Sequence, residues 1–102
     1  MFAIIRLYHL SPIFEESFKS DWSSLVYAFR AHDAFVAARL HKESPVTFIA
    51  YECWKSKESY LEVMNDYEGK IREPLEKLKD NCNDIKLLHS MDMIEAHAID
   101  GQ

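Results

Sequence analysis

Residues 45–60 read PVTFIAYECWKSKESY, and this stretch decides the fold. Its first part, Val46–Trp54, is predicted to be a β-strand, because β-branched and aromatic residues fill it and no glycine or proline interrupts it. Alternation gives the strand two sides, one with Val46, Phe48, Ala50, Glu52 and Trp54, the other with Thr47, Ile49, Tyr51 and Cys53. Since both sides are largely apolar, this strand belongs at the centre of a sheet covered on both faces.

The residues before this strand predict a first strand and a long helix. The strand is Phe2–Tyr8, in which Arg6 is the one charged residue. Ser11 and Pro12 then open a helix, because serine caps helix N-termini and proline suits the first helical position. The helix is expected to end near residues 31–33. Its apolar stripe comprises Phe14, Phe18, Trp22, Leu25, Val26 and Phe29.

Two more strands and a second helical region complete the chain. The strand Ala34–His41 is expected to join the central strand through a four-residue loop, 42–45. Ser56 begins a helix that carries Tyr60, Leu61, Met64 and Tyr67, and Pro74 starts a further helical segment. The last strand is Ile85–Ala96, with one side predicted to hold Ile85, Leu87, His89, Met91 and Met93.

The resulting order, β-α-β-β-α-β, predicts a single α+β domain over residues 1–102, with a frayed tail at 97–102. In this ferredoxin-like arrangement a four-stranded antiparallel sheet carries its helices on one face. The strands are nevertheless apolar on both sides, and two helical regions shelter only one of them. A homodimer through sheet-to-sheet packing is therefore expected.

The amino-acid composition limits the classes of partner that this protein can bind. The net charge of −5 argues against nucleic acid and anionic membranes, which need a basic surface. An RNA-binding RRM shares this strand order, but VTFIAYECW lacks the glycine and basic residues of its motif. The two cysteines, Cys53 and Cys82, suit a reducing compartment, and no signal or membrane-spanning segment is recognisable. A cytoplasmic protein is expected.

The motif Glu52-Cys53-Trp54-Lys55-Ser56, followed by Tyr60, resembles the antibiotic biosynthesis monooxygenase-like dimeric α/β-barrel family over residues 2–96. That family includes cofactor-independent oxygenases of polyketide and quinol substrates, haem-degrading enzymes, isomerases and members without known activity. The resemblance implies a dimer formed by sheet packing. It also implies a small-molecule pocket between sheet and helices in each subunit.

Haem is disfavoured by the residues at the positions that the haem-degrading branch uses. Ile5 stands where that branch has an asparagine in the first strand, and the axial histidine would fall near Arg72 or Glu73. No histidine lies between Trp54 and His89, so haem iron has no proximal imidazole there. The five histidines show no metal-ligand spacing, and we expect no cofactor.

Four aromatic residues are candidates for contact with a substrate. Trp54 and Trp22 could line a pocket for a flat aromatic molecule, or could fill the core between helix and sheet. Tyr8 and Tyr60 could donate hydrogen bonds to a ligand carbonyl, although core packing with a satisfied hydroxyl is the commoner outcome.

Two titratable residues are weak catalytic candidates. Glu52 lies within an apolar strand and could act as a base on a phenolic substrate, or form an ion pair with Arg6 or Arg39. His9, at the end of the first strand, is the best proton-transfer candidate if it is not simply a surface residue. Arg6, Arg39 and His41 are alternatively interface groups of the dimer.

Two functions follow. The first is a cofactor-independent monooxygenase acting on a small aromatic or quinol-type substrate, for which the protein supplies a base, desolvation and orientation. The second is a non-catalytic dimer that binds a small apolar ligand or is associated with stress.

Overall fold

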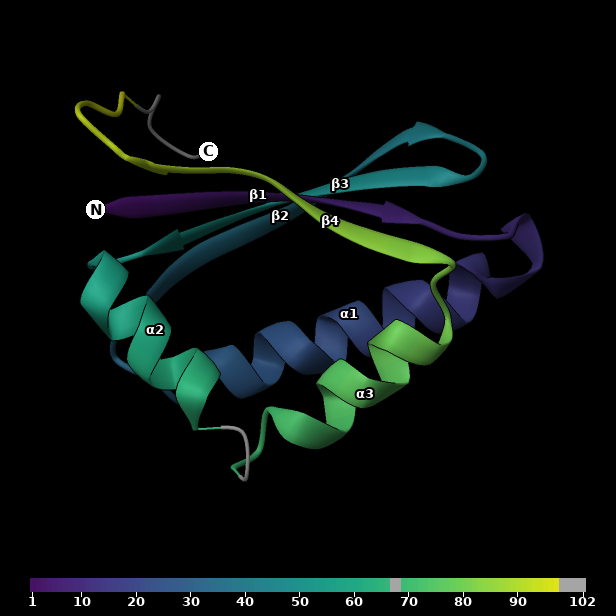
Figure 1. The fold of residues 1–102 in the computed structure, drawn as a ribbon, viewed down its shortest axis with the longest axis horizontal. Helices are drawn as coiled ribbons and strands as arrows, with labels where there is room; N and C mark the ends of the chain where they lie inside the picture. Colours follow the sequence, from purple (N-terminus) through teal and green to yellow (C-terminus); the bar gives the residue numbers. More distant parts are fainter. Residues whose placement is uncertain (67–68, 98–102) are drawn as a thin grey trace.

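The computed structural model describes residues 1–66 and 69–97. Its four strands form one sheet in the order β2-β3-β1-β4, with every neighbouring pair antiparallel (Figure 1). The strands are β1 (Phe2–His9), β2 (Phe35–Ser44), β3 (Thr47–Trp54) and β4 (Asp84–Asp92). The strand that decided the prediction, β3, lies at the centre beside β1.

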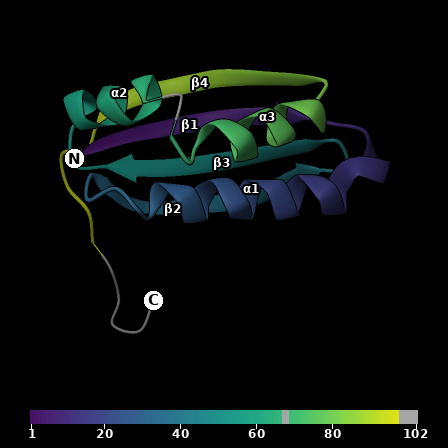
Figure 2. The same cartoon turned by 90° about the horizontal axis from the view of Figure 1, so that it is seen from below.

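All of the helices pack on one face of this sheet (Figures 1 and 2). They are the short 3₁₀-helix η1 (Pro12–Phe14), α1 (Glu15–Phe29), α2 (Lys57–Asn65) and α3 (Arg72–Asp80). The predicted ferredoxin-like α+β fold is thus confirmed. None of the described helices is long and apolar enough to cross a membrane.

The first helix begins and ends differently from the prediction. Ser11 makes no capping hydrogen bond with its side chain, and Pro12 starts η1 instead, so α1 begins only at Glu15. Phe14, predicted to be in the apolar stripe, is 41% exposed for this reason. At the other end, α1 stops at Phe29 because the following backbone N–H groups bond across tight turns.

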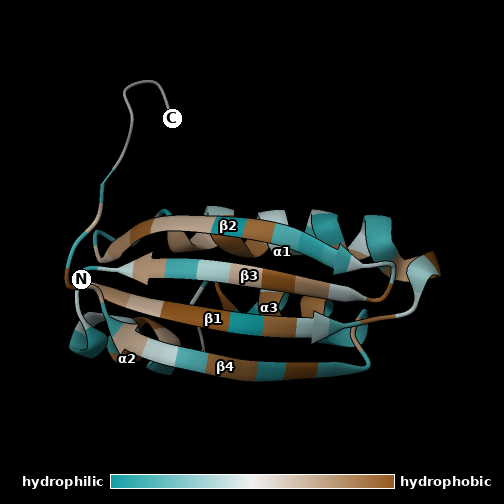
Figure 3. Cartoon of the chain, turned by 90° about the horizontal axis from the view of Figure 1, so that it is seen from above, coloured by the Kyte–Doolittle hydropathy of each residue, from teal (hydrophilic) through white to brown (hydrophobic). Residues whose placement is uncertain are grey.

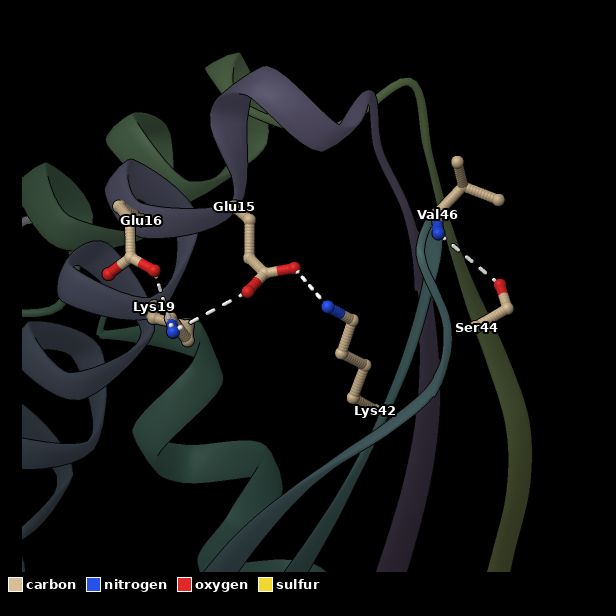
Figure 4. Close-up of polar contacts among 6 residues, drawn as sticks. All are labelled: Glu15, Glu16, Lys19, Lys42, Ser44 and Val46. Atoms are coloured by element: carbon tan, nitrogen blue, oxygen red, sulfur yellow. Dashed lines mark hydrogen bonds and ion pairs between the residues drawn. The ribbon is translucent and has the colours of Figure 1, made fainter.

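The hairpin between β2 and β3 is tighter than predicted. Ser44 pairs with Thr47, so Pro45 and Val46 alone form the turn in place of a four-residue loop. The hydroxyl of Ser44 accepts a hydrogen bond from the backbone N–H of Val46 at 3.3 Å (Figure 4). Such a side-chain bond two residues along the chain stabilises a turn locally.

An ion pair ties the end of β2 to the start of α1 (Figure 4). Lys42 Nζ lies 2.6 Å from Glu15 Oε1, and Lys19 Nζ lies 3.5 Å from the other oxygen of the same carboxylate. The hydrogen bond from Lys42 lowers the pKa of Glu15. Because these groups meet solvent, the ion pair contributes little to the stability of the fold.

Both edge strands contain an irregularity. In β2 the register shifts between Phe35 and Ala37, and in β4 it shifts at Leu88. The predicted alternation of the last strand is therefore wrong: Leu87 lies opposite Arg6, whereas His89 lies opposite Ile5 on the other face. The strand also ends at Asp92 instead of Ala96.

In α2 the predicted cap is confirmed, because the hydroxyl of Ser56 accepts a hydrogen bond from the N–H of Ser59 at 3.1 Å. Tyr67 and the predicted tail beyond His97 lie outside the described residues.

Aromatic rings fill the core between sheet and helices. The Phe18 ring of α1 lies 5.1 Å from both the Tyr8 ring of β1 and the Phe48 ring of β3, measured between centroids. All three side chains are buried. These tilted contacts join the first helix to the two central strands.

The opposite face of the sheet carries no described helix (Figure 3). Apolar side chains lie at its centre and are half-buried, namely Ile5, Leu7, Ile49 and Tyr51. At one end Met1 Sδ lies 3.7 Å from Cys53 Sγ, and the segment after β4 begins with Met93 N–H bonded to Met1 O. Within residues 1–66 and 69–97, no helix covers the centre of this face.

Phe18→Ala should lower the free energy of unfolding by about 3–5 kcal/mol, since it empties the space between β1, β3 and α1. Urea denaturation measures this change. Phe14→Ala, at a 41% exposed position, is the matched control and should cost far less. Equal losses for the two variants would contradict the described core.

Candidate functional site

Among residues 1–66 and 69–97, Glu52 of β3 is the one buried charged residue, and it is 2% exposed. It lies on the helix-covered side of the sheet, where alternation also places Phe48 and Trp54. Glu52 Oε2 accepts a hydrogen bond from Arg6 Nε at 3.0 Å, and Oε1 accepts one from the indole Nε1 of Trp54 at 3.2 Å. Both carboxylate oxygens are therefore occupied.

Arg6 connects this carboxylate to the second helix. Its Nη2 donates a hydrogen bond to the Tyr60 hydroxyl at 2.5 Å, and its Cζ lies 5.8 Å from the centroid of the Tyr60 ring. The Ser56 cap sets the start of α2, and one helical turn later Tyr60 is directed back toward the sheet. Strands β1 and β3 and helix α2 thus meet at one polar cluster, which consists of Arg6, Glu52, Trp54 and Tyr60.

Burial dominates the electrostatics of this cluster. It raises the pKa of Glu52, while the charge of Arg6 and the indole N–H of Trp54 oppose that rise. Burial also raises the pKa of Tyr60, against the opposing effect of Arg6. For Arg6, burial alone would lower the pKa, but Glu52 and the nearby tyrosines bring it above its usual value.

The cluster is closed on one side and reachable on the other. The side chain of Glu52 is 3% exposed, whereas that of Arg6 is 18% exposed and Tyr60 is half-buried. Leu87 of β4, which pairs with Arg6 across the strands, is 56% exposed. Access from solvent therefore leads first to Arg6 and Tyr60, with Glu52 behind them.

The remaining predicted aromatic residues lie in the core or elsewhere. Trp54 is fully enclosed, with ring contacts to Phe29, Phe35 and Tyr60 at centroid distances of 5.0, 5.2 and 5.5 Å. Tyr8 is buried against Phe18, and burial raises its pKa further above the usual value. Both side chains therefore fill the core, which is the alternative to substrate contact that the sequence left open.

Trp22 and His9 are not brought to the cluster. Trp22 lines a cavity of about 290 Å³ with residues of α1 and with Ala38 of β2. His9 is exposed at the end of β1, and alternation places it on the uncovered face of the sheet. Arg39 and His41 of β2 lie on the same face, because they pair with Tyr51 and Ile49. Arg6 points to the helices, so it cannot be an interface group of the kind predicted.

The five described cavities open elsewhere. A cavity of about 370 Å³ lies between α1 and α3, lined by Tyr27, Ala28 and Pro74 among others, and one of about 420 Å³ lies beside α2. None of these five is lined by Glu52, Trp54, Tyr8 or Tyr60. Within residues 1–66 and 69–97, no three histidine, cysteine or acidic side chains gather as metal ligands.

Sequence reasoning named Arg6 as a partner of Glu52 but did not connect it to Tyr60. The first contact was predictable from alternation. Arg6 lies on the same side of β1 as Ile4 and Tyr8, and Glu52 lies on the same side of β3 as Phe48 and Trp54. The second depends on how α2 returns over the sheet, for which the sequence contains no local signal.

Glu52→Gln should change how stability depends on pH. Because the folded pKa is raised, the contribution of Glu52 is fully present below its unfolded pKa of about 4.3 and is lost as pH rises through the folded pKa. Wild type should therefore lose stability relative to Glu52→Gln as the pH rises from about 4. Urea denaturation across this range measures it, with Glu62→Gln on the exposed side of α2 as control. If wild type instead gains stability relative to Glu52→Gln as the pH rises, then Arg6 lowers the pKa of Glu52.

Comparison by sequence gives no match to any protein family model and no significant match among curated proteins. Comparison by structure gives several. A variant of SnoaB, described as a cofactor-independent oxygenase from Streptomyces nogalater, superposes with a TM-score of 0.78 and 11% identity, covering 93% of this chain and 94% of that one.

Two further structures are candidate antibiotic biosynthesis monooxygenases. The protein from Nitrosomonas europaea has a TM-score of 0.75 and 13% identity, covering 93% of this chain and all (100%) of that one. The protein from Deinococcus radiodurans has a TM-score of 0.74 and 16% identity, covering 99% of this chain and 100% of that one. Over nearly its whole length, this chain therefore has the antibiotic biosynthesis monooxygenase-like fold.

Proposed function

We propose that this protein is a cofactor-independent monooxygenase of small aromatic or quinol-type substrates. The observation that carries the proposal is the polar cluster of Arg6, Glu52, Trp54 and Tyr60, placed between sheet and helices. The likeness in fold to structures named as monooxygenases, SnoaB among them, supports it. Buried charged groups are costly, and titratable groups with strongly shifted pKa values cluster at functional sites.

The proposed reaction needs an electron-rich substrate that ionises and then reacts with dioxygen. An activated CH₂ group between aromatic rings loses two hydrogens and gains one oxygen atom, and the second oxygen atom leaves as water. The protein's part is to orient the anion and exclude water. We place the substrate against Arg6 and Tyr60, with the exposed Leu87 as an adjacent apolar surface.

A non-catalytic ligand-binding protein, including a stress-associated one, is the second candidate. It is favoured by the state of Glu52, whose two oxygens are both engaged, and by the enclosure of Trp54. A base that already accepts two hydrogen bonds is poorly available to take a proton. Binding of an aromatic ligand without oxygen consumption would distinguish this function from the first.

We also propose that two copies pair through their uncovered sheet faces. The half-buried Ile5, Leu7, Ile49 and Tyr51 form an apolar centre there, flanked by the polar Arg39 and His41 of β2. Apolar centres with polar rims are typical of protein interfaces. The free thiols of Cys53 and Cys82 agree with the cytoplasmic location that we infer for the dimer.

Wild-type protein should increase oxygen uptake from an anthrone-type or quinol substrate above the uncatalysed rate, as measured with an oxygen electrode. Tyr60→Phe should lower this rate about tenfold, because it removes a hydroxyl that we place against the substrate. Tyr27→Phe, at an exposed position on α1, is the control. Uptake no faster than in buffer would refute the oxygenase proposal.

Sedimentation at micromolar concentration should give the mass of a dimer. Ile49→Lys should yield a monomer, since it places a charge at the centre of the proposed interface. Ile13→Lys, at a position that is 82% exposed in η1, should stay dimeric. A wild-type monomer would rule out the sheet-to-sheet pair.

A further inference from the structure

We propose that the sulfur atoms of Met1, Cys53 and Met93 form a binding site for monovalent copper, and we call these three residues the sulfur cluster. His97 adds a nitrogen ligand. All four side chains line one cavity of about 270 Å³. This cavity lies on the uncovered face of the sheet, at the end where β1 begins and β3 ends, so the sheet separates it from the polar cluster.

The thiol of Cys53 is the buried ligand of this site. The residue is 3% exposed, and its Sγ lies 3.7 Å from Sδ of Met1. Two sulfur ligands that each lie about 2.3 Å from a tetrahedrally coordinated metal are about 3.8 Å apart. The two sulfur atoms therefore already have the spacing that a shared metal ion requires. An ordinary contact between two sulfur atoms has a similar spacing, so the inference also needs the remaining ligands.

Met93 brings a second thioether to the same place. It follows β4, and its backbone N–H donates a hydrogen bond to the carbonyl oxygen of Met1 at 2.8 Å. This bond holds the two methionines side by side, although they come from opposite ends of the sheet's strand order in sequence. Met93 is half-buried and Met1 is 58% exposed, so a metal ion reaches the buried thiol from the side of the thioethers.

His97 contributes to the ligand set from the segment after β4. Its Nε2 lies 3.3 Å from Oε2 of Glu95. A ligating imidazole commonly donates the N–H of its second nitrogen to such a carboxylate, which here leaves Nδ1 for the metal. The His97 side chain is 82% exposed and has to be ordered on binding, so we expect it to contribute less than the sulfur cluster.

The ligand set selects monovalent copper. Thiolate and thioether sulfur are soft ligands, and two thioethers favour Cu⁺ over Zn²⁺, whose protein ligands are cysteine, histidine and carboxylate side chains. Arg39 also lines the cavity, and its positive charge opposes a divalent cation more strongly than a monovalent one. On binding, Cu⁺ replaces the thiol proton of Cys53, which passes to water, and the copper–thiolate unit carries no net charge.

The site is independent of the proposed function. All of its ligands come from one chain, so it does not require the pairing of two copies, and none of them belongs to the polar cluster. It contains a single cysteine and a single histidine, and it therefore differs from the groups of three histidine, cysteine or acidic side chains that are absent from the described residues.

Anaerobic titration of the reduced protein with Cu⁺, in competition with the chromophoric chelator bicinchoninate, tests the inference. Wild type should take up one Cu⁺ per chain. Cys53→Ser and Met93→Leu should each weaken the affinity about tenfold or more, because each removes a soft ligand. Cys82→Ser and Met64→Leu change a thiol and a thioether outside the cavity, so these matched controls should bind as wild type does.

Met93→Leu decides the outcome if Cys53→Ser does not fold, since leucine replaces methionine with little change in volume. An unchanged affinity in Met93→Leu, or a loss of binding in either control, would overturn the inference. Displacement of Cu⁺ by an equal concentration of Zn²⁺, or the absence of stoichiometric uptake by wild type, would overturn it as well.

Discussion

The structure depends on how one buried carboxylate is neutralised. Glu52 stands at the centre of an apolar layer, where an unpaired charge would cost several kcal/mol. Arg6 supplies the opposite charge from the adjacent strand, and Trp54 supplies a second donor from the same strand. Through Tyr60 the network extends to α2, so two strands and a helix are held in one relative position. An apolar triad of similar volume would often be at least as stable, and this favours a role for the cluster beyond stability.

The fold was largely predictable because its central strand is unusual. Apolar residues on both sides of Val46–Trp54 require a covered sheet, and the order of elements then leaves few topologies. The details that failed are local. The two-residue turn at Pro45 and Val46 and the 3₁₀ start at Pro12 are variants of a turn and of a helix start that the same residue types can form in more than one way. Residue preferences alone do not choose between these variants.

The candidate site was predictable only in part. Alternation alone separates His9 from Arg6, since odd and even positions of β1 face opposite sides. It does not say which aromatic residues the helices enclose. Trp54 is packed among three rings, whereas Tyr60 stays half-buried, because α2 lies closer to the end of the sheet than α1 does (Figure 2). How far each aromatic side chain is exposed depends on how the helices pack on the sheet, and the sequence pattern does not predict this.

The irregular edge strands have a consequence for how copies of this protein can associate. At Leu88 in β4, and between Phe35 and Ala37 in β2, the backbone departs from a regular ladder. A strand from another molecule would find its hydrogen-bonding groups out of step at both borders of the sheet. The irregular edge strands therefore disfavour edge-to-edge pairing into fibrils, although the uncovered face of the sheet is apolar enough to associate with another molecule.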